Sequence, residues 1–315
     1  MLPIICIGVL ANLAFSWYAT GNGKALDWSR FSVVYLVPAA FLSLLPWFWH
    51  AVRLAIWSRF FGVEISGIDL LRIAIATDVG GAIAPQAVGG APVKMAMLVQ
   101  QGYKPGTAAS LTLLGNFEEV AVFSLIIPAS LFMTRPWQNP LWQHIGHFLE
   151  KNGWLLLTGM LFLFALLHIL KRTAVFDRII RKTSRWWQHL ASDFRQAIKL
   201  IWSKGRRPFI WSILVLSVQW ITRFAVLLAV LRALGISGNF LHFFLLQWMI
   251  FVAMIFVPTP GAAGGAEAAF LLVFGRTIPM TLLGPALTGW RFLTYYFMLL
   301  VGVGLLWFLS RRAEN

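Results

Sequence analysis

The sequence predicts an all-α polytopic membrane protein with about six transmembrane helices and two re-entrant helical hairpins, arranged as an inverted-topology repeat. Three observations carry this prediction: a very apolar composition, two matched Pro/Gly breaks, and one strongly basic segment. The 315 residues are 59% hydrophobic and only 12% charged, with a mean hydropathy of +0.76. Soluble domains are not this apolar, so we expect a single membrane domain over residues 1–315.

Six continuous apolar stretches are long enough to cross a bilayer, which takes about 20 helical residues. They cover residues 2–20, 33–56, 107–133, 153–170, 209–233 and 281–309. The chain is apolar from Leu2 onward and has no basic residues before this point. The first stretch is therefore expected to be a membrane span rather than a cleaved signal peptide.

Two further apolar segments, 67–101 and 240–275, are interrupted in the middle by the same pattern, P-x3-G-G-A. The predicted breaks are Pro85, Gly89 and Gly90 in the first segment, and Pro258, Pro260, Gly264 and Gly265 in the second. Proline lacks a backbone donor and glycine has little helical preference, so a continuous helix through either break is disfavoured. Each segment is predicted to be a re-entrant hairpin whose tip is buried in protein or lines a cavity.

The segment 171–207 carries eleven Lys and Arg residues against two Asp, which is most of the net charge of +15. Flanked by apolar spans, it is expected to lie in the cytoplasm, together with the C-terminus, rather than to bind nucleic acid. Counting spans outward from it gives the halves 1–133 and 153–310 opposite orientations. Matched breaks in inverted halves are typical of transporters. The alternative is that small, kinked segments only permit close helix packing.

The same basic segment has apolar residues spaced three, four or seven apart. These are Phe176, Ile180, Trp187, Leu190, Phe194, Ile198 and Ile201. The pattern predicts an amphipathic helix able to lie on the inner leaflet and attract anionic lipids. A connector packed on the protein's own cytoplasmic face explains the pattern equally well.

Charged residues within the apolar segments are the candidates for function, because each costs at least about 2.5 kcal/mol at the bilayer centre. They are Asp78, Lys94, Glu118, Glu119, Arg223, Glu267 and Arg291. The three cations, with the glycine-rich tips Gly89-Gly90 and Gly264-Gly265, are predicted to bind an anionic group such as a lipid phosphate. The three glutamates are predicted to balance this charge or to carry protons.

Each candidate has a structural alternative. Glu267 lies in the first turn of a short helix, where a carboxylate complements the helix dipole. Arg223 can form a structural ion pair with a glutamate, Lys94 can extend towards the cytoplasmic surface, and Asp78 can cap or pair locally. Enzyme motifs are not found, His144 and His147 alone are a weak metal signal, and we expect no metal and no cofactor.

The sequence around the two breaks resembles that of a known family. The resembling residues run from Pro85 to Lys94, Gly115 to Glu119, Pro258 to Glu267, and Gly289 to Tyr296. They resemble the membrane domain of bacterial lysyl-phosphatidylglycerol synthase/flippase proteins and their stand-alone relatives, over nearly the whole chain. The resemblance implies a lipid-translocating protein in the bacterial inner membrane, with Lys94, Glu118, Glu267 and Arg291 at the family's polar motif positions.

Two departures from the family pattern limit what the resemblance implies. The family often has Glu-Arg where this chain has Glu118-Glu119, so the local charge balance differs. The chain ends at Asn315 with no soluble aminoacyl-transfer domain, so we expect translocation of a lipid and no enzymatic synthesis.

The resulting hypothesis is a flippase that moves an anionic or phosphate-linked lipid between leaflets. Polyprenyl-linked lipids and glycolipids are among the candidate cargoes. Its alternatives are a non-transporting partner of a glycosyltransferase or lipid-synthesis enzyme, and an intramembrane lipid-modifying enzyme. The sharpest geometric prediction is that the two glycine pairs lie close together. Lys94, Glu118, Glu267 and Arg291 are then expected around one cavity.

Overall fold

The computed structural model describes residues 32–84, 89–134, 154, 158, 192, 195–196, 198–257 and 259–311. The predicted spans 2–20 and 153–170 lie outside these residues, as do most of the basic segment 171–207 and the prolines Pro85 and Pro258. The described part is all-helical and contains no β-strand. This confirms the predicted all-α class.

Among the described residues, four helical stretches are long and apolar enough to cross a membrane: Val33–Phe61, Pro105–Thr134, Arg206–Ala233 and Met280–Leu309. They correspond to four of the six predicted spans. The first contains the short 3-10 turn η2 (Val33–Tyr35) and α2 (Leu36–Phe61); the second is α5 (Pro105–Thr134) and the third α8 (Arg206–Ala233). The fourth runs through α11 (Met280–Arg291), the π-helix η4 (Phe292–Tyr296) and α12 (Phe297–Arg311).

Each predicted broken segment consists of two short helices. The first contains α3 (Gly67–Ile83) and α4 (Gly90–Gln100), and the second contains α9 (Phe240–Ile255) and α10 (Gly265–Phe274). None of the four reaches the roughly 20 residues that a crossing helix needs, and the helices of each pair pack against one another. The interruption of both segments is confirmed, while their depth in a membrane stays a prediction.

Glycines at the two breaks have different physical roles. A Cβ on Gly90 would lie 2.8 Å from the Thr77 carbonyl oxygen, so Gly90 lets α4 approach the backbone of α3. Gly264, the N-cap of α10, has φ +83° with open space around it. Its backbone lies in a region that residues with side chains rarely adopt. The first glycine therefore serves packing and the second serves a turn.

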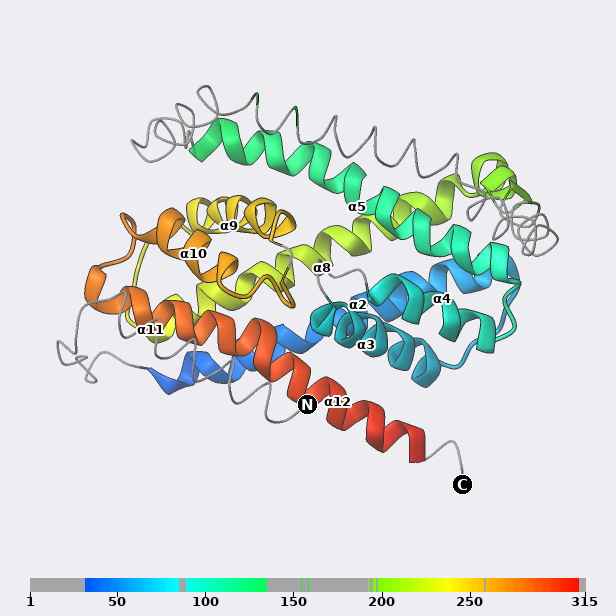
Figure 1. The fold of residues 1–315 in the computed structure, drawn as a ribbon, viewed down its shortest axis with the longest axis horizontal. Helices are drawn as coiled ribbons and strands as arrows, with labels where there is room; N and C mark the ends of the chain where they lie inside the picture. The colour runs from blue at the N-terminus through cyan, green and yellow to red at the C-terminus, as the bar shows by residue number, and fades with distance from the viewer. Residues whose placement is uncertain are drawn as a thin grey trace.

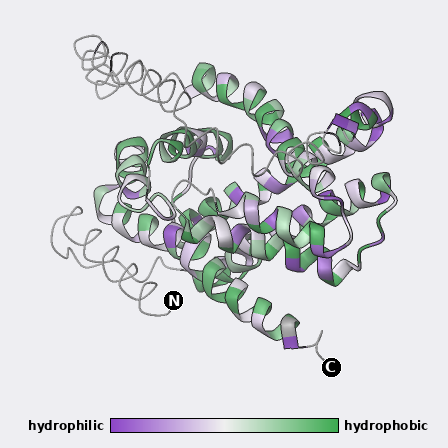
Figure 2. Ribbon diagram, turned by 45° about the vertical axis from the view of Figure 1, so that its right-hand side comes forward, coloured by the Kyte–Doolittle hydropathy of each residue, from purple (hydrophilic) through white to green (hydrophobic). Residues whose placement is uncertain are grey.

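Helices from one half of the chain pack against helices from the other half (Figure 1). α2 and α8 cross in the centre, with α3 and α4 on one side and α9 and α10 on the other. α5, which follows the first broken segment, packs on α9 of the second; α12, which follows the second, packs on α3 of the first. Hydrophobic residues predominate over the ribbon, with hydrophilic ones scattered among them (Figure 2).

Candidate functional site

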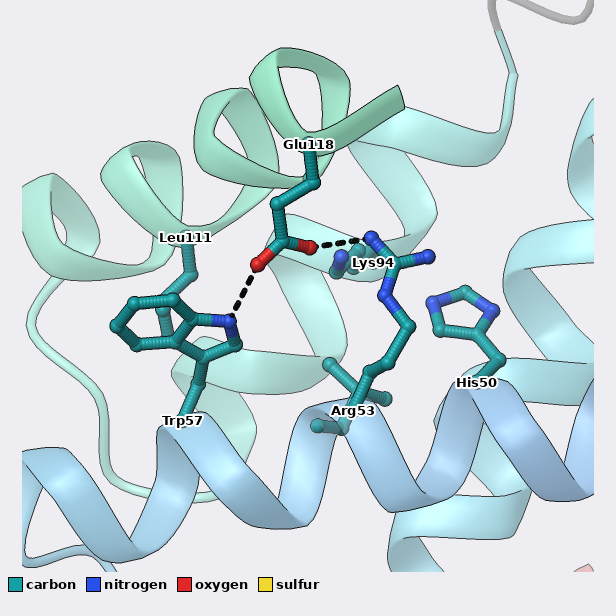
Figure 3. Close-up of a pocket in the computed structure, with 8 residues that line it drawn as sticks. His50, Arg53, Trp57, Lys94, Leu111 and Glu118 are labelled. Carbon is teal, nitrogen blue, oxygen red and sulfur yellow. Dashed lines mark hydrogen bonds and ion pairs between the residues drawn. The ribbon is translucent and has the colours of Figure 1, made fainter. Parts of the chain in front are cut away.

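A small pocket lies where α2, α4 and α5 meet (Figure 3). It is lined by His50, Arg53, Leu54, Trp57, Lys94, Leu111, Gly115 and Glu118. Its volume is about 10 Å³, which is the space of about one water molecule. The pocket is therefore closed around its own side chains.

Glu118 of α5 is held by two donors from α2. Arg53 Nη2 donates to Glu118 Oε2 at 2.5 Å, and Trp57 Nε1 donates to Glu118 Oε1 at 2.9 Å. Arg53 and Trp57 reach the same carboxylate because residues four apart lie on one face of a helix. Arg53 Nη1 also donates to Gln219 Oε1 of α8 at 3.3 Å. The network thus joins three of the long helices: Glu118, only 1% exposed, connects α5 to α2, and Arg53 connects α2 to α8.

Lys94 of α4 supplies a second cation to this pocket. It is 9% exposed, and among the described residues it forms no ion pair and no hydrogen bond. A Cβ on Gly115 would lie 3.3 Å from Lys94 Nζ, so this glycine leaves space for the ammonium group. The buried Arg53 Nε also has no hydrogen-bond partner in the described structure. Two cationic side chains therefore line the pocket against one carboxylate.

His50 connects the pocket with a second ion cluster. Its Nδ1 lies 4.0 Å from Asp78 Oδ1 of α3, and Asp78 Oδ2 accepts a hydrogen bond from Arg223 Nη2 of α8 at 3.2 Å. The Arg223 guanidinium also lies 5.3 Å from the centre of the Trp220 ring. The partner of Arg223 is therefore an aspartate of α3, where the sequence suggested a glutamate.

The second broken segment contains a separate ion pair, between Glu267 of α10 and Arg291 of α11. Arg291 Nε donates to Glu267 Oε1 at 2.7 Å, and the two side chains are 3% and 6% exposed. Glu267 Oε2 accepts from the Gly264 backbone N–H at 2.7 Å, as an acidic third helical residue does at a capped N-terminus. Arg291 Nη2 donates to the Gly261 carbonyl at 2.5 Å and the guanidinium lies 4.8 Å from the Tyr295 ring centre.

Tyr295 links the two breaks. Its hydroxyl donates to the Ala82 carbonyl, near the end of α3, at 3.0 Å. A Cβ on Gly261 would overlap the Tyr295 ring, so the tip of the second segment packs directly on this tyrosine. Tyr295 lies in a π-helix, a distortion that is frequent at functional sites.

The predicted single cavity around Lys94, Glu118, Glu267 and Arg291 is not what the structure shows. Lys94 and Glu118 share the pocket, whereas Glu267 and Arg291 pair with each other and do not line it. The reason is that each carboxylate finds an arginine nearby: Arg53 of α2 takes Glu118, and Arg291 takes Glu267. Glu119 follows Glu118 on α5 but is not part of the pocket lining.

Two charged or ionisable residues of the pocket, His50 and Arg53, are not among the site residues predicted from the sequence. Both lie within the apolar stretch 33–56, where a charged residue is as costly as in the other spans. Their spacing from Trp57, at seven and four residues, was the available signal, because it places three polar groups on one face of an apolar helix. The second partner, Glu118, lies 65 residues further along the chain from Arg53.

Comparison with known proteins extends these observations over the whole chain. The model of the family described as "Lysylphosphatidylglycerol synthase TM region" matches residues 5–302. A protein of the archaeon Archaeoglobus fulgidus, described as "UPF0104 membrane protein", is 26% identical over 310 residues, which cover 92% of each of the two chains. All helices that build the pocket lie within the matched region.

Proposed function

We propose a lipid-translocating function for this chain from one premise: it belongs to the lysylphosphatidylglycerol synthase transmembrane-region family. In this proposal the protein moves an anionic or phosphate-linked lipid between the leaflets of the bacterial inner membrane. It does so as a transporter and not as an enzyme. The anionic headgroup is the part of the lipid that must be recognised, because its transfer through the bilayer centre is the costly step.

The observation that carries this proposal is a second cation in the pocket, Lys94, beside the paired Arg53. Arg53 is already paired with Glu118, so Lys94 is left as a buried ammonium without an ion pair among the described residues. A buried charge is stable only when something compensates it. A phosphate from a lipid headgroup supplies one negative charge and several acceptor oxygens, which Lys94 Nζ and the free Arg53 Nε can bind.

In this conformation the pocket is too small for a phosphate, so binding requires α4 and α5 to separate. The pocket lies against α4, one of the two short helices of the first broken segment. Interrupted helices are the elements that form the substrate site in many transporters. We therefore place the headgroup between α4 and the adjoining long helices.

We also propose that the two broken segments are re-entrant hairpins of an inverted-topology repeat. Exchanging α2 with α8, α3–α4 with α9–α10, and α5 with α11–α12 maps most helix contacts onto one another. The packing of α5 on α9 and of α12 on α3 is the clearest such pair. This correspondence supports an internal repeat of the two halves. In our proposal the hairpins form an inverted pair, and the basic segment 171–207 lies on the cytoplasmic side because of its charge.

Transport by the purified protein in liposomes tests the proposal. Fluorescent phosphatidylglycerol and phosphatidylcholine are placed in both leaflets, and the fraction reduced by external dithionite reports exchange. We expect wild type to exchange the anionic lipid faster than the zwitterionic one. Lys94→Met should slow this exchange by about 10- to 100-fold, which corresponds to the loss of one charge-assisted hydrogen bond of about 1.5–3 kcal/mol.

Lys104→Met is the matched control, because Lys104 is exposed in the short connection between α4 and α5. Its exchange rate should equal that of wild type. Wild-type protein that exchanges no lipid above empty liposomes would refute translocation. If such protein still co-purified with a glycosyltransferase or lipid-synthesis enzyme, it would support the role of a non-transporting partner.

A further inference from the structure

His50 is a buried ionisable side chain to which the proposed function assigns no role. It lines the pocket beside Arg53 and Lys94, and its other neighbour is Asp78. The charged groups around it come from every helix packed there. They are Arg53 on α2, Asp78 on α3, Lys94 on α4, Glu118 and Glu119 on α5, and Arg223 on α8.

The position of His50 makes its charge depend on the contents of the pocket. Histidine is the side chain whose ordinary charge change lies nearest neutral pH. In the closed pocket a proton on His50 adds a positive charge beside Arg53 and Lys94, and like charges repel. An anion held by Lys94 adds a negative charge at the same place, so it favours the protonated imidazole.

The second ion cluster is less enclosed by protein than the pocket. The side chains of Asp78 and Arg223 are 25% and 36% exposed, whereas that of Glu118 is 1% exposed. Asp78 Oδ1 lies 4.0 Å from His50 Nδ1, which is an ion-pair distance once the imidazole carries its proton. The Asp78 side of His50 is therefore less enclosed by protein than the Glu118 side.

We propose that anion binding in the Lys94–Arg53 pocket is coupled to protonation of His50, so that the anionic lipid is carried together with a proton. The proton comes from water on the Asp78 side, converts the neutral imidazole to imidazolium at Nδ1, and passes to water on the opposite side of the membrane when the anion leaves there. This inference rests on the proposed function for the identity of the anion and adds an energy source to it. A proton gradient then drives accumulation of the lipid in one leaflet.

Proton uptake on binding is the direct test. Short-chain phosphatidylglycerol is a suitable probe, because its phosphodiester keeps one negative charge between pH 6 and 8 and any proton must come to the protein. Titration calorimetry of the purified protein in buffers of different ionisation enthalpy counts the protons taken up per lipid bound. We expect uptake of up to one proton, and an affinity that falls by up to about tenfold per pH unit as the pH rises.

His50→Gln should bind the probe with less proton uptake than wild type and with a weaker dependence on pH. His242→Gln is the matched control, because His242 lies on α9 and does not line the pocket; it should behave as wild type. Wild-type binding without proton uptake would overturn the coupling, and so would unchanged uptake in His50→Gln. A wild-type protein with no saturable binding at all would remove the proposed anion site itself, which is a distinguishable result.

Discussion

Replacing Arg291 by methionine tests whether the Glu267–Arg291 pair holds the second broken segment together. The pair is buried, with side-chain exposures of 3% and 6%, and it joins α11 to the N-terminus of α10 and to the Gly261 carbonyl. The substitution removes the Arg291 guanidinium that pairs with the buried Glu267 carboxylate. Removing one partner of a buried ion pair costs about 3–5 kcal/mol, and we expect a loss of unfolding free energy in this range.

The measurement is unfolding in mixed micelles by increasing fractions of SDS, followed by tryptophan fluorescence, for Arg291→Met, Glu267→Gln and the double variant. Each single change removes the ion-pair partner of the other residue. The unfolding free energy lost in the double variant should therefore be about 2 kcal/mol smaller than the sum of the two single losses. Arg72→Met is the matched control: Arg72 and Asp69 form an ion pair at 3.1 Å with side chains 23% and 28% exposed. Its loss should stay below about 1 kcal/mol.

Two results would refute this reasoning. One is a loss below about 1 kcal/mol for Arg291→Met, similar to that of the half-buried control pair. The other is full additivity of the two single changes, since coupled partners deviate from additivity. Either result would leave Arg291 available for the substrate-binding role that the sequence suggested.

Two glycine substitutions separate packing from function. Gly90→Ala should lower the melting temperature, because its Cβ would lie 2.8 Å from the Thr77 carbonyl oxygen; Gly67→Ala, with nothing within 4 Å, is the neutral control. Gly115→Ala should weaken anion binding and lipid exchange while stability stays equal or rises, because the Cβ crowds Lys94 Nζ and alanine gains about 1 kcal/mol of helix propensity. Unchanged melting in the first, or unchanged anion binding in the second, would contradict these roles.

The helix breaks were predictable because their causes are local. Proline and glycine disfavour a helix wherever they occur, so the ends of α3 near Ile83 and of α9 near Ile255 follow from the nearby residues alone. The long helices were predictable for the same kind of reason, since about 20 consecutive apolar residues define a span without reference to partners. The N-terminal role of Glu267 in α10 was also available from its position.

The ion-pair partners were not predictable, because they depend on which helices meet. Arg53 reaches Glu118 across 65 residues, and Arg223 reaches Asp78 across 145. The sequence shows which charged residues lie in apolar segments, but several different ion pairs can be formed among them. The expectation of a single cavity did not include Arg53 among the buried charges. Arg53 pairs with Glu118, and Lys94 therefore lines the pocket without an ion pair among the described residues.

The most direct test of the central claim is an experimental structure of the protein in nanodiscs that contain phosphatidylglycerol, compared with one in phosphatidylcholine alone. We expect an opened pocket between α4 and α5 in phosphatidylglycerol, with a headgroup phosphate within hydrogen-bond distance of Lys94 Nζ. In phosphatidylcholine the pocket should stay closed, with Glu118 on Arg53 as described. An anionic headgroup bound elsewhere, with the Lys94 pocket closed in both lipids, would contradict the account.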